Sequence, residues 1–262
     1  MDLGIAGKKA LVMSSSRGLG LGIAQALAAE GCDVLLTGRS EDRLRAEAEA
    51  ITAKGAGRAD YVRVDLTEEL SVDVLAKAAE EKLGQVDILV NNTGGPPPGR
   101  MVDAEPDVLA FQFDAMVLRV VSLTKSLLPG MRERGWGRII TVGSSGVIQP
   151  IPTLGLSNAV RSALVGWSKS LAGDVAADGV TVNMLLPGRI HTERVDELDA
   201  AASERTGKDI DETRAASRAT IPAGRYGSVE EFAAVAAFLA SAPASYVTGS
   251  MVRCDGGAIR NV

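Results

Sequence analysis

Short apolar segments alternate with longer amphipathic segments along almost the whole chain. The short segments predict strands at residues 9–13, 33–37, 61–64, 86–90, 138–142, 180–186 and 250–253. The long segments predict helices at residues 18–30, 41–54, 68–83, 112–134, 154–177 and 229–241, the fourth with helical periodicity only as far as Pro129. Most strands are continuous apolar runs, which is typical of parallel strands covered on both faces. The alternation therefore predicts an α/β fold, an open parallel sheet of about seven strands with helices on both faces.

One segment, residues 189–227, interrupts this rhythm. It is long, charged and rich in Ala, Ser and Thr, and it predicts helices at residues 192–205 and near residues 211–218. An insertion of this length between a strand and the last helix is typical of a lid or substrate-binding flap. The alternative is a solvated helical hairpin without a role in binding. We find no repeat or linker, so residues 1–262 are expected to form one domain that carries this insertion.

Composition narrows the classes of function. The chain has 262 residues and a net charge of −5, and only 3% of its residues are aromatic, which disfavours nucleic acid and anionic membranes as partners. One histidine, His191, and two cysteines, Cys32 and Cys254, are too few for a zinc, haem or iron–sulfur site, so no metal is expected. The longest apolar run, residues 232–240, is short of a bilayer span. We expect a cytoplasmic protein with reduced thiols.

Residues 14–20 follow the first predicted strand and lead into the first predicted helix. They read Ser-Ser-Ser-Arg-Gly-Leu-Gly, and Gly18 and Gly20 allow close approach of the backbone. In such a turn, backbone N–H groups and the positive end of the helix face the pyrophosphate of a dinucleotide. The alternative is a turn whose glycines serve only to pack the helix against the sheet.

With this turn as its starting point, the whole chain resembles the short-chain dehydrogenase/reductase family, in particular its 3-oxoacyl-acyl-carrier-protein reductases. Gly18 and Gly20 match the family pattern T-G-x-x-x-G-x-G, whereas Met13 and Ser14 replace its first two residues. Residues 91–94, 187–192 and 246–257 resemble three further family motifs. The resemblance implies a single-domain Rossmann-type fold, a nicotinamide dinucleotide, and a homo-oligomer, dimer or tetramer, formed through the helices at 112–134 and 154–177.

The choice of nucleotide depends on the end of the second strand. An acidic residue there would bind a ribose 2′-hydroxyl, but this chain has Arg39, which suits a 2′-phosphate, and Arg17 could flank the same group. We therefore expect NADP(H), with NAD(H) less favoured. The cofactor-binding residues implied by the resemblance are Ser14, Ser16, Arg17, Gly18, Leu19, Gly20, Arg39, Asp65, Leu66, Asn91, Thr93, Gly94, Arg161, Pro187, Gly188, Ile190 and Thr192. If the turn needs a positive φ at Ser14, that serine costs roughly 1–2 kcal/mol, which the hydroxyls of residues 14–16 could offset by donating to phosphate.

The family's catalytic set is Ser, Tyr, Lys and Asn, and this chain departs from it. Ser144 matches the Ser, while Ser157, Arg161 and Met116 stand at the Tyr, Lys and Asn positions. An aliphatic hydroxyl is a far weaker acid than a phenol, and a guanidinium keeps its proton, so the proton must take a non-standard path. Arg161 can still stabilise an oxyanion or hold the nicotinamide ribose. We take Ser144, Ser157 and Arg161 as the candidate catalytic residues.

Two features beside this site stay open. His191 is the only other side chain that could act as an acid near neutral pH, although a lone loop histidine is more often simply exposed. The three prolines at residues 96–98 either narrow the pocket or only stiffen a loop.

The sequence therefore favours an oxidoreductase that transfers hydride between NADP(H) and a small carbonyl or alcohol substrate. One alternative is a dinucleotide-binding sensor or scaffold that is catalytically weak or silent. A weaker one is a pocket that has lost the nucleotide and takes another small ligand.

Overall fold

A computed structural model describes residues 2–261 and contains a seven-stranded sheet in the order β3-β2-β1-β4-β5-β6-β7. Every pair of neighbouring strands is parallel. The strands are β1 (Lys9–Val12), β2 (Asp33–Gly38), β3 (Ala59–Arg63), β4 (Ile88–Asn91), β5 (Gly137–Val142), β6 (Val180–Pro187) and β7 (Met251–Cys254). The predicted parallel Rossmann-type sheet is confirmed.

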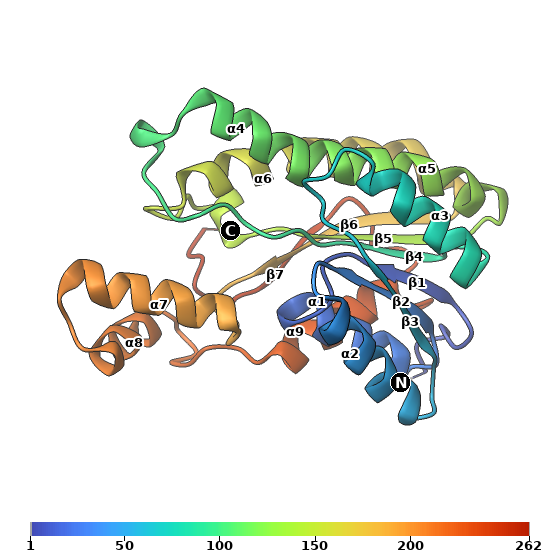
Figure 1. Cartoon of the computed structure of the whole chain (residues 1–262), viewed down its shortest axis with the longest axis horizontal. Helices are drawn as coiled ribbons and strands as arrows, with labels where there is room; N and C mark the ends of the chain where they lie inside the picture. Colours follow the sequence, from blue (N-terminus) through green and yellow to red (C-terminus); the bar gives the residue numbers. More distant parts are fainter. Residues whose placement is uncertain (1, 262) are drawn as a thin grey trace.

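Helices cover both faces of the sheet (Figure 1). One layer contains α1 (Gly18–Ala29), α2 (Glu41–Ala53) and α9 (Val229–Ala240). The opposite layer contains α3 (Ser71–Leu83), α4 (Pro106–Phe113), α5 (Arg119–Glu133) and α6 (Gly155–Val175). Two cores result, one on each side of the sheet. Along β1, for example, Ala10 and Val12 face the α1–α9 side, whereas Leu11 and Met13 face the α5–α6 side. Because successive side chains of a strand point to opposite faces, burial on both faces requires an unbroken apolar run.

The helix expected at residues 112–134 is longer and less regular than its pattern predicts. It begins at Pro106, passes through a π-helical turn at Asp114–Leu118, and continues as α5 through Pro129 to Glu133. The helix therefore continues beyond Pro129, where the helical periodicity of the sequence ends, and stops one residue before the predicted end at residue 134. A proline removes one helical hydrogen bond, but Met131 beyond it is fully buried, and this tertiary packing holds the last turn in place.

Smaller differences affect other boundaries. β3 begins at Ala59 and ends at Arg63, whereas residues 61–64 were predicted. α3 begins at Ser71 rather than at residue 68, because residues 65–70 form hydrogen-bonded turns, with Glu68 N–H donating to Asp65 and Ser71 N–H to Glu68. Such shifts of a few residues follow from local turn chemistry, which periodicity does not detect.

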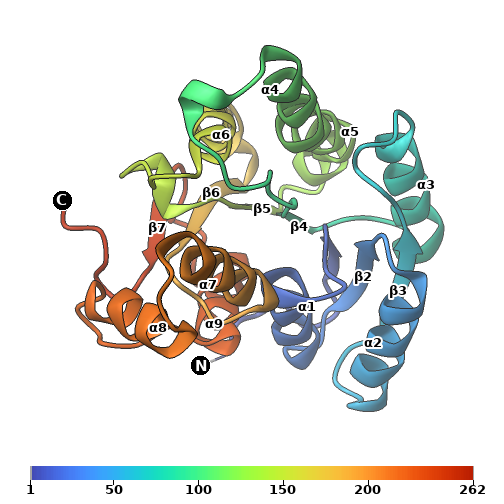
Figure 2. The same ribbon diagram turned by 60° about the vertical axis from the view of Figure 1, so that its left-hand side comes forward.

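The segment at residues 189–227 forms two helices, α7 (Glu193–Thr206) and α8 (Ile210–Ala219). Figures 1 and 2 place both beyond the carboxyl end of the sheet, on the side of β7 and α9. Asp199 anchors the pair, because its buried carboxylate accepts hydrogen bonds from Arg189 at 2.6 Å and from the Tyr226 hydroxyl at 2.9 Å. Among the helices of residues 2–261, none is long and apolar enough to cross a membrane.

α1 packs tightly against α9 at Gly22. A Cβ atom added to Gly22 would lie 2.1 Å from Cγ1 of Val229. We expect Gly22→Ala to destabilise the protein by about 1–3 kcal/mol through overpacking. Val229→Ala should relieve the clash, so the double variant should be more stable than the sum of the two single changes indicates. Urea unfolding followed by circular dichroism measures this, and strictly additive effects would contradict the packing argument.

Candidate functional site

The carboxyl ends of β1, β4, β5 and β6 meet at one edge of the sheet. The strand order reverses between β1 and β4, since β2 lies on one side of β1 and β4 on the other. In open parallel sheets, such a switch point leaves a crevice between the loops that follow the two strands. The loops here are residues 13–17 after β1, 92–99 after β4, 143–154 after β5 and 188–192 after β6. All candidate residues except Arg39, Asp65 and Leu66 lie in or beside these loops.

The turn after β1 is strained at Ser14. Its φ is +48°, a left-handed conformation that costs a non-glycine residue roughly 1–2 kcal/mol. Two hydrogen bonds hold it there: its N–H donates to Thr37 Oγ1 at 3.0 Å, and its carbonyl oxygen accepts from Asn92 Nδ2 at 3.2 Å. Asn92 therefore joins the turn to the loop after β4. Its role was missed from the sequence, because the contact spans 78 positions.

Ser15 is not free to serve a ligand. It is completely buried, its hydroxyl donates to the Val12 carbonyl at 2.7 Å, and its oxygen accepts from Thr37 N–H at 2.9 Å. The expectation that the hydroxyls of residues 14–16 share phosphate binding is therefore wrong for Ser15, which ties β1 to β2 instead. Only Ser14 and Ser16 remain as candidates for that role.

The amino end of α1 has the properties of an anion site. The helix begins at Gly18 with φ of +58°, and Arg17 before it provides no side-chain cap. The N–H groups of its first turn, including that of Leu19, therefore lack the side-chain acceptor that helix ends commonly recruit. Gly20 lies against the turn, since a Cβ there would be 2.4 Å from the Ser14 carbonyl oxygen. The residues present thus fit a phosphate-bearing coenzyme.

Three arginines surround the end of β2 and this turn. Arg17 forms an ion pair with Glu193, the first residue of α7, and Arg43 on α2 approaches the same carboxylate at 3.5 Å. The short salt bridges of Glu193, chiefly to Arg17, lower the pKa of its carboxyl. Arg39 is exposed just beyond β2. The segment at residues 189–227 therefore contacts the nucleotide turn through Glu193.

Asp65 and Leu66 follow β3, the strand that pairs with β2, which ends just before Arg39. Burial opposes ionisation of Asp65, but hydrogen bonds from Thr67 N–H and Oγ1 and the charges of Arg39 and Arg63 outweigh it and lower its pKa. The carboxylate thus closes a turn before α3 rather than capping that helix, which begins at Ser71. Leu66 packs partly against the core on the α3 side.

Some residues at the end of β4 and in the loop after it are buried in the core, and others face the crevice. The Asn91 side chain is buried and donates to Thr124 Oγ1 at 3.2 Å and Thr141 Oγ1 at 3.5 Å, so only its main chain can face a coenzyme. Thr93 and Gly94 turn their carbonyl oxygens toward α6, where both accept from Arg161 Nη2, at 3.4 and 3.0 Å.

Arg161 is the most unusual group in the site. It is 8% exposed, and its three hydrogen bonds go to the main-chain carbonyls of Thr93, Gly94 and Val142. Among residues 2–261 it has no carboxylate within ion-pair distance. Burial, and to a smaller extent the charge of Arg194, lower the pKa of Arg161 to about 10, so it keeps its charge at neutral pH. A buried cation held only by carbonyl dipoles is prepared to meet negative charge.

Ser144 and Ser157 belong to the two elements that Arg161 joins, the end of β5 and α6. Ser144 follows β5, and its oxygen accepts from Gly146 N–H at 3.1 Å, which leaves the hydroxyl proton available to a ligand. Ser157 lies one helical turn before Arg161 on α6, so both share a face of that helix. Beside Ser157, Asn158 exchanges two hydrogen bonds with the main chain of Ile151 and fixes the loop after β5. Met116, in the π-helical turn, is buried.

The loop after β6 approaches the nucleotide turn. Gly188 donates to the Cys254 carbonyl at 2.9 Å, and a Cβ there would lie 2.6 Å from Asp255 Cα. Pro187 ends β6, and Ile190 is buried. Thr192 comes near Gly18, whose Cβ position would be 3.8 Å from Thr192 Cγ2. This brings the loops after β1 and β6 to the same crevice.

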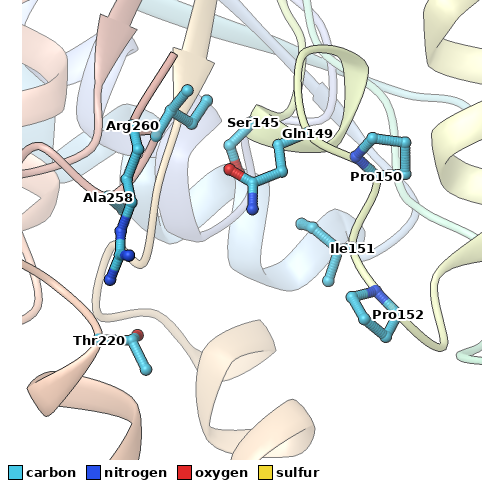
Figure 3. A pocket seen from close by; sticks show the side chains of 9 residues that line it. Ser145, Gln149, Pro150, Ile151, Pro152, Thr220, Ala258 and Arg260 are labelled. Atoms are coloured by element: carbon cyan, nitrogen blue, oxygen red, sulfur yellow. The ribbon is translucent and has the colours of Figure 1, made fainter.

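Two cavities open near these loops. One, of about 360 Å³, begins at Ser145 beside Ser144 and extends to residues 258–260 (Figure 3). The other, of about 350 Å³, is lined by His191 together with Arg214, Arg218 and Arg225. The His191 side chain is two-thirds exposed and lies 3.5 Å from Asp196. His191 thus lines a different cavity from the one beside Ser144.

Comparison with known proteins accounts for this architecture. A family model described as Enoyl-(Acyl carrier protein) reductase matches residues 13–258. The chain belongs to the short-chain dehydrogenase/reductase family. As a member, it is 35% identical to the 3-oxoacyl-[acyl-carrier-protein] reductase FabG of Salmonella typhimurium, over 96% of this chain and 97% of the relative. The resemblance to 3-oxoacyl reductases is confirmed.

Solved structures of other reductases in this family superimpose closely. L-sorbose reductase from Gluconobacter frateurii, complexed with NADPH and L-sorbose, has a TM-score of 0.94 at 34% identity, with all of both chains covered. An actinorhodin polyketide ketoreductase variant with NADPH has a TM-score of 0.91 at 30% identity, covering 96% of this chain and 97% of that one. This short-chain dehydrogenase/reductase is therefore similar throughout its length to proteins solved with NADPH.

The strain at Ser14 leads to a stability prediction. Ser14→Gly relieves the left-handed conformation but adds freedom to the unfolded chain, so we expect a net gain of about 1 kcal/mol. Ser16→Gly is the matched control, because its φ is not positive and the change should be neutral or destabilising. Urea unfolding of the original protein and of both variants measures the free energy of unfolding of each. A Ser14→Gly protein no more stable than the original would show that the turn is not strained.

Proposed function

We propose that this protein is an NADP(H)-dependent oxidoreductase that interconverts a small carbonyl compound and its alcohol by a non-standard proton path. The observation that carries the proposal is the buried Arg161, which has no carboxylate within ion-pair distance among residues 2–261 and donates to Val142, two residues before Ser144, at the edge of the sheet where the nucleotide turn also lies. The reductase relatives and the neighbours solved with NADPH support the coenzyme and the reaction class.

The coenzyme supplies or accepts the hydride when bound, and the chain's own residues hold it. The first turn of α1, with Gly18, Leu19 and Gly20, would receive the pyrophosphate. Arg39, with Arg17 and Arg43 nearby, would receive the 2′-phosphate, because a guanidinium binds phosphate through two donors. The nicotinamide end would lie between the Thr93–Gly94 loop and the segment that contains Pro187, Gly188, Ile190 and Thr192.

Arg161 and Ser144 would act on the substrate oxygen. Reduction of a carbonyl builds negative charge on that oxygen, and a buried guanidinium with an adjacent hydroxyl stabilises it without reorganising. By the resemblance, Ser157 and Arg161 stand where the family has its Tyr and Lys, yet neither is a competent acid at neutral pH. Because His191 lines the other cavity, we assign the proton to water reaching the oxygen from the open crevice.

Two further parts of the proposal concern the flap and the assembly. Residues 189–227 would act as the substrate flap, since Glu193 and Arg194 already contact opposite sides of the crevice: Glu193 pairs with Arg17, and Arg194 donates to the Pro96 carbonyl at 3.0 Å. A homo-oligomer built on α4, α5 and α6 remains a prediction. Phe111 and Leu118 are exposed apolar side chains on that layer.

Arg39 should decide between the two coenzymes. We expect Arg39→Ala to weaken NADPH binding by about ten- to a hundredfold, the loss of one charged hydrogen-bonded contact, and to leave NADH binding nearly unchanged. Arg45→Ala on α2 is the matched control and should affect neither. Fluorescence titration with both coenzymes measures this. Equal losses for NADPH and NADH would place Arg39 outside the 2′-phosphate site.

Turnover tests the reaction itself. With a panel of ketones and aldehydes, we expect NADPH oxidation that Ser144→Ala lowers by about a hundredfold, as removal of one oxyanion donor does. Ser157→Ala should lower it less than tenfold, because Ser157 is not the acid. Ser162→Ala, exposed on α6, is the control. A protein that binds NADPH but oxidises it no faster than the Ser144→Ala variant would instead be a silent dinucleotide-binding protein.

A further inference from the structure

The cavity beside Ser144 has walls of distinct chemistry. Pro150, Ile151 and Pro152 form one side, and Thr220 and Arg260 lie on the opposite side, with Gln149 and Ser145 between them (Figure 3). Ile259 adds a further apolar contact. Because Ser145 directly follows Ser144, a substrate whose carbonyl contacts Ser144 would extend its remaining atoms into this cavity. At about 360 Å³, the space suits a small molecule of one ring or a short carbon chain.

The only charge that lines this cavity is positive. Of its nine lining residues, Arg260 is the only one with an ionisable side chain, and no carboxylate is among them. The chain as a whole carries a net charge of −5, so its acidic residues are in excess yet do not line this space. A cleft whose walls carry one sign of charge concentrates ligands of the opposite sign.

The inner end of the same region is also cationic. Arg161 is buried beside Ser144 without a carboxylate partner among residues 2–261. Arg194 also reaches this loop, since its Nη2 donates to the Pro96 carbonyl at 3.0 Å, but its charge is paired with Glu197 at 3.1 Å, so Arg161 supplies the unpaired positive charge. A substrate reaching from Ser144 to the outer wall therefore lies between Arg161 and Arg260.

The second cavity shows that arginines alone do not make such a site. Arg214 is 2.8 Å from the Asp196 carboxylate, and Arg225 is 2.6 Å from that of Glu231, so both charges are neutralised within the protein. Arg218, the third arginine of that cavity, has no carboxylate within ion-pair distance among residues 2–261, but no residue of that cavity is next to Ser144 in the chain. Of the two cavities, only the one that contains Ser145 and Arg260 adjoins the proposed catalytic residue Ser144.

We propose that the substrate is an oxo acid, in which an apolar chain or ring separates the reducible carbonyl from a carboxylate that Arg260 binds. This rests on the proposed function, since it names the substrate class of that site. Arg260 is then a specificity-determining residue, and Pro150, Ile151 and Ile259 contact the apolar spacer.

Matched pairs of substrates test the proposal. Rates of NADPH oxidation are compared for 4-oxopentanoate, 5-oxohexanoate and 4-acetylbenzoate and for the methyl ester of each, which removes only the charge. We expect kcat/KM to be about tenfold or more higher for at least one acid than for its ester, because a charged hydrogen bond forms only with the acid. Esters reduced as well as their acids throughout would overturn the proposal and leave the proposed function intact.

Variants of Arg260 then test whether this residue causes the preference for the acid. Arg260→Gln should reduce kcat/KM for the preferred acid to that of its ester by raising KM, with kcat and the ester unaffected, and Arg260→Lys should restore much of the difference. Arg58→Gln, which removes one exposed charge at the amino end of β3, is the control and should change neither substrate. A preference for the acid that survives Arg260→Gln would overturn the assignment to Arg260.

A binding measurement separates this proposal from the reaction. Calorimetry of the protein with NADP⁺ and 4-isopropylbenzoate, which has no carbonyl to reduce, should show binding that the methyl ester lacks and that Arg260→Gln abolishes. Binding of the acid without turnover of any ketone would support the anion site and contradict the proposed function. No binding of the acid, with no preference in turnover, would overturn the anion site.

Discussion

The geometry of the site depends on one buried guanidinium. Arg161 extends from α6 and donates to main-chain carbonyls after β4 and at the end of β5, so it joins three elements that meet at the crevice. A lysine could carry the same charge, but only a planar fork reaches separated carbonyls at once. Because these acceptors are dipoles rather than carboxylates, the charge is not cancelled and stays available to a negative group. The proposed chemistry rests on this arrangement, whereas the proposed substrate class rests on Arg260 at the outer end of the neighbouring cavity.

Much of the fold could be predicted from the sequence because parallel strands buried on both faces need unbroken apolar runs. The seven strands were therefore located to within a few residues, as β1 and β6 show. Pro129 shows the limit of local rules, because burial of Met131 outweighs the helix-breaking tendency of the proline. The early start at Pro106 was missed because its residues are mostly exposed and give little periodic signal.

The candidate site was less predictable, since its contacts join residues far apart in sequence. The bond from Asn92 to Ser14 and the pairing of Glu193 with Arg17 depend on how loops approach one another, which no local pattern encodes. Ser15 was wrongly expected to help bind phosphate, because that expectation used only its residue type. In the fold Ser15 is buried, and its hydroxyl donates to the Val12 carbonyl. His191 could be recognised as titratable, but only the fold shows that it lines a separate cavity.

The nucleotide turn contains two small-residue positions with different physical demands. At Ser14 the difficulty is torsional, because its φ of +48° is left-handed, and the serine side chain is accommodated at a modest energetic cost. At Gly20 the difficulty is steric, since a Cβ would meet the Ser14 carbonyl oxygen at 2.4 Å and Asn92 Nδ2 at 2.8 Å. The room for mutation in this turn is therefore unequal: a side chain at position 14 strains only its own backbone torsion, whereas a side chain at position 20 would force the turn or Asn92 to move.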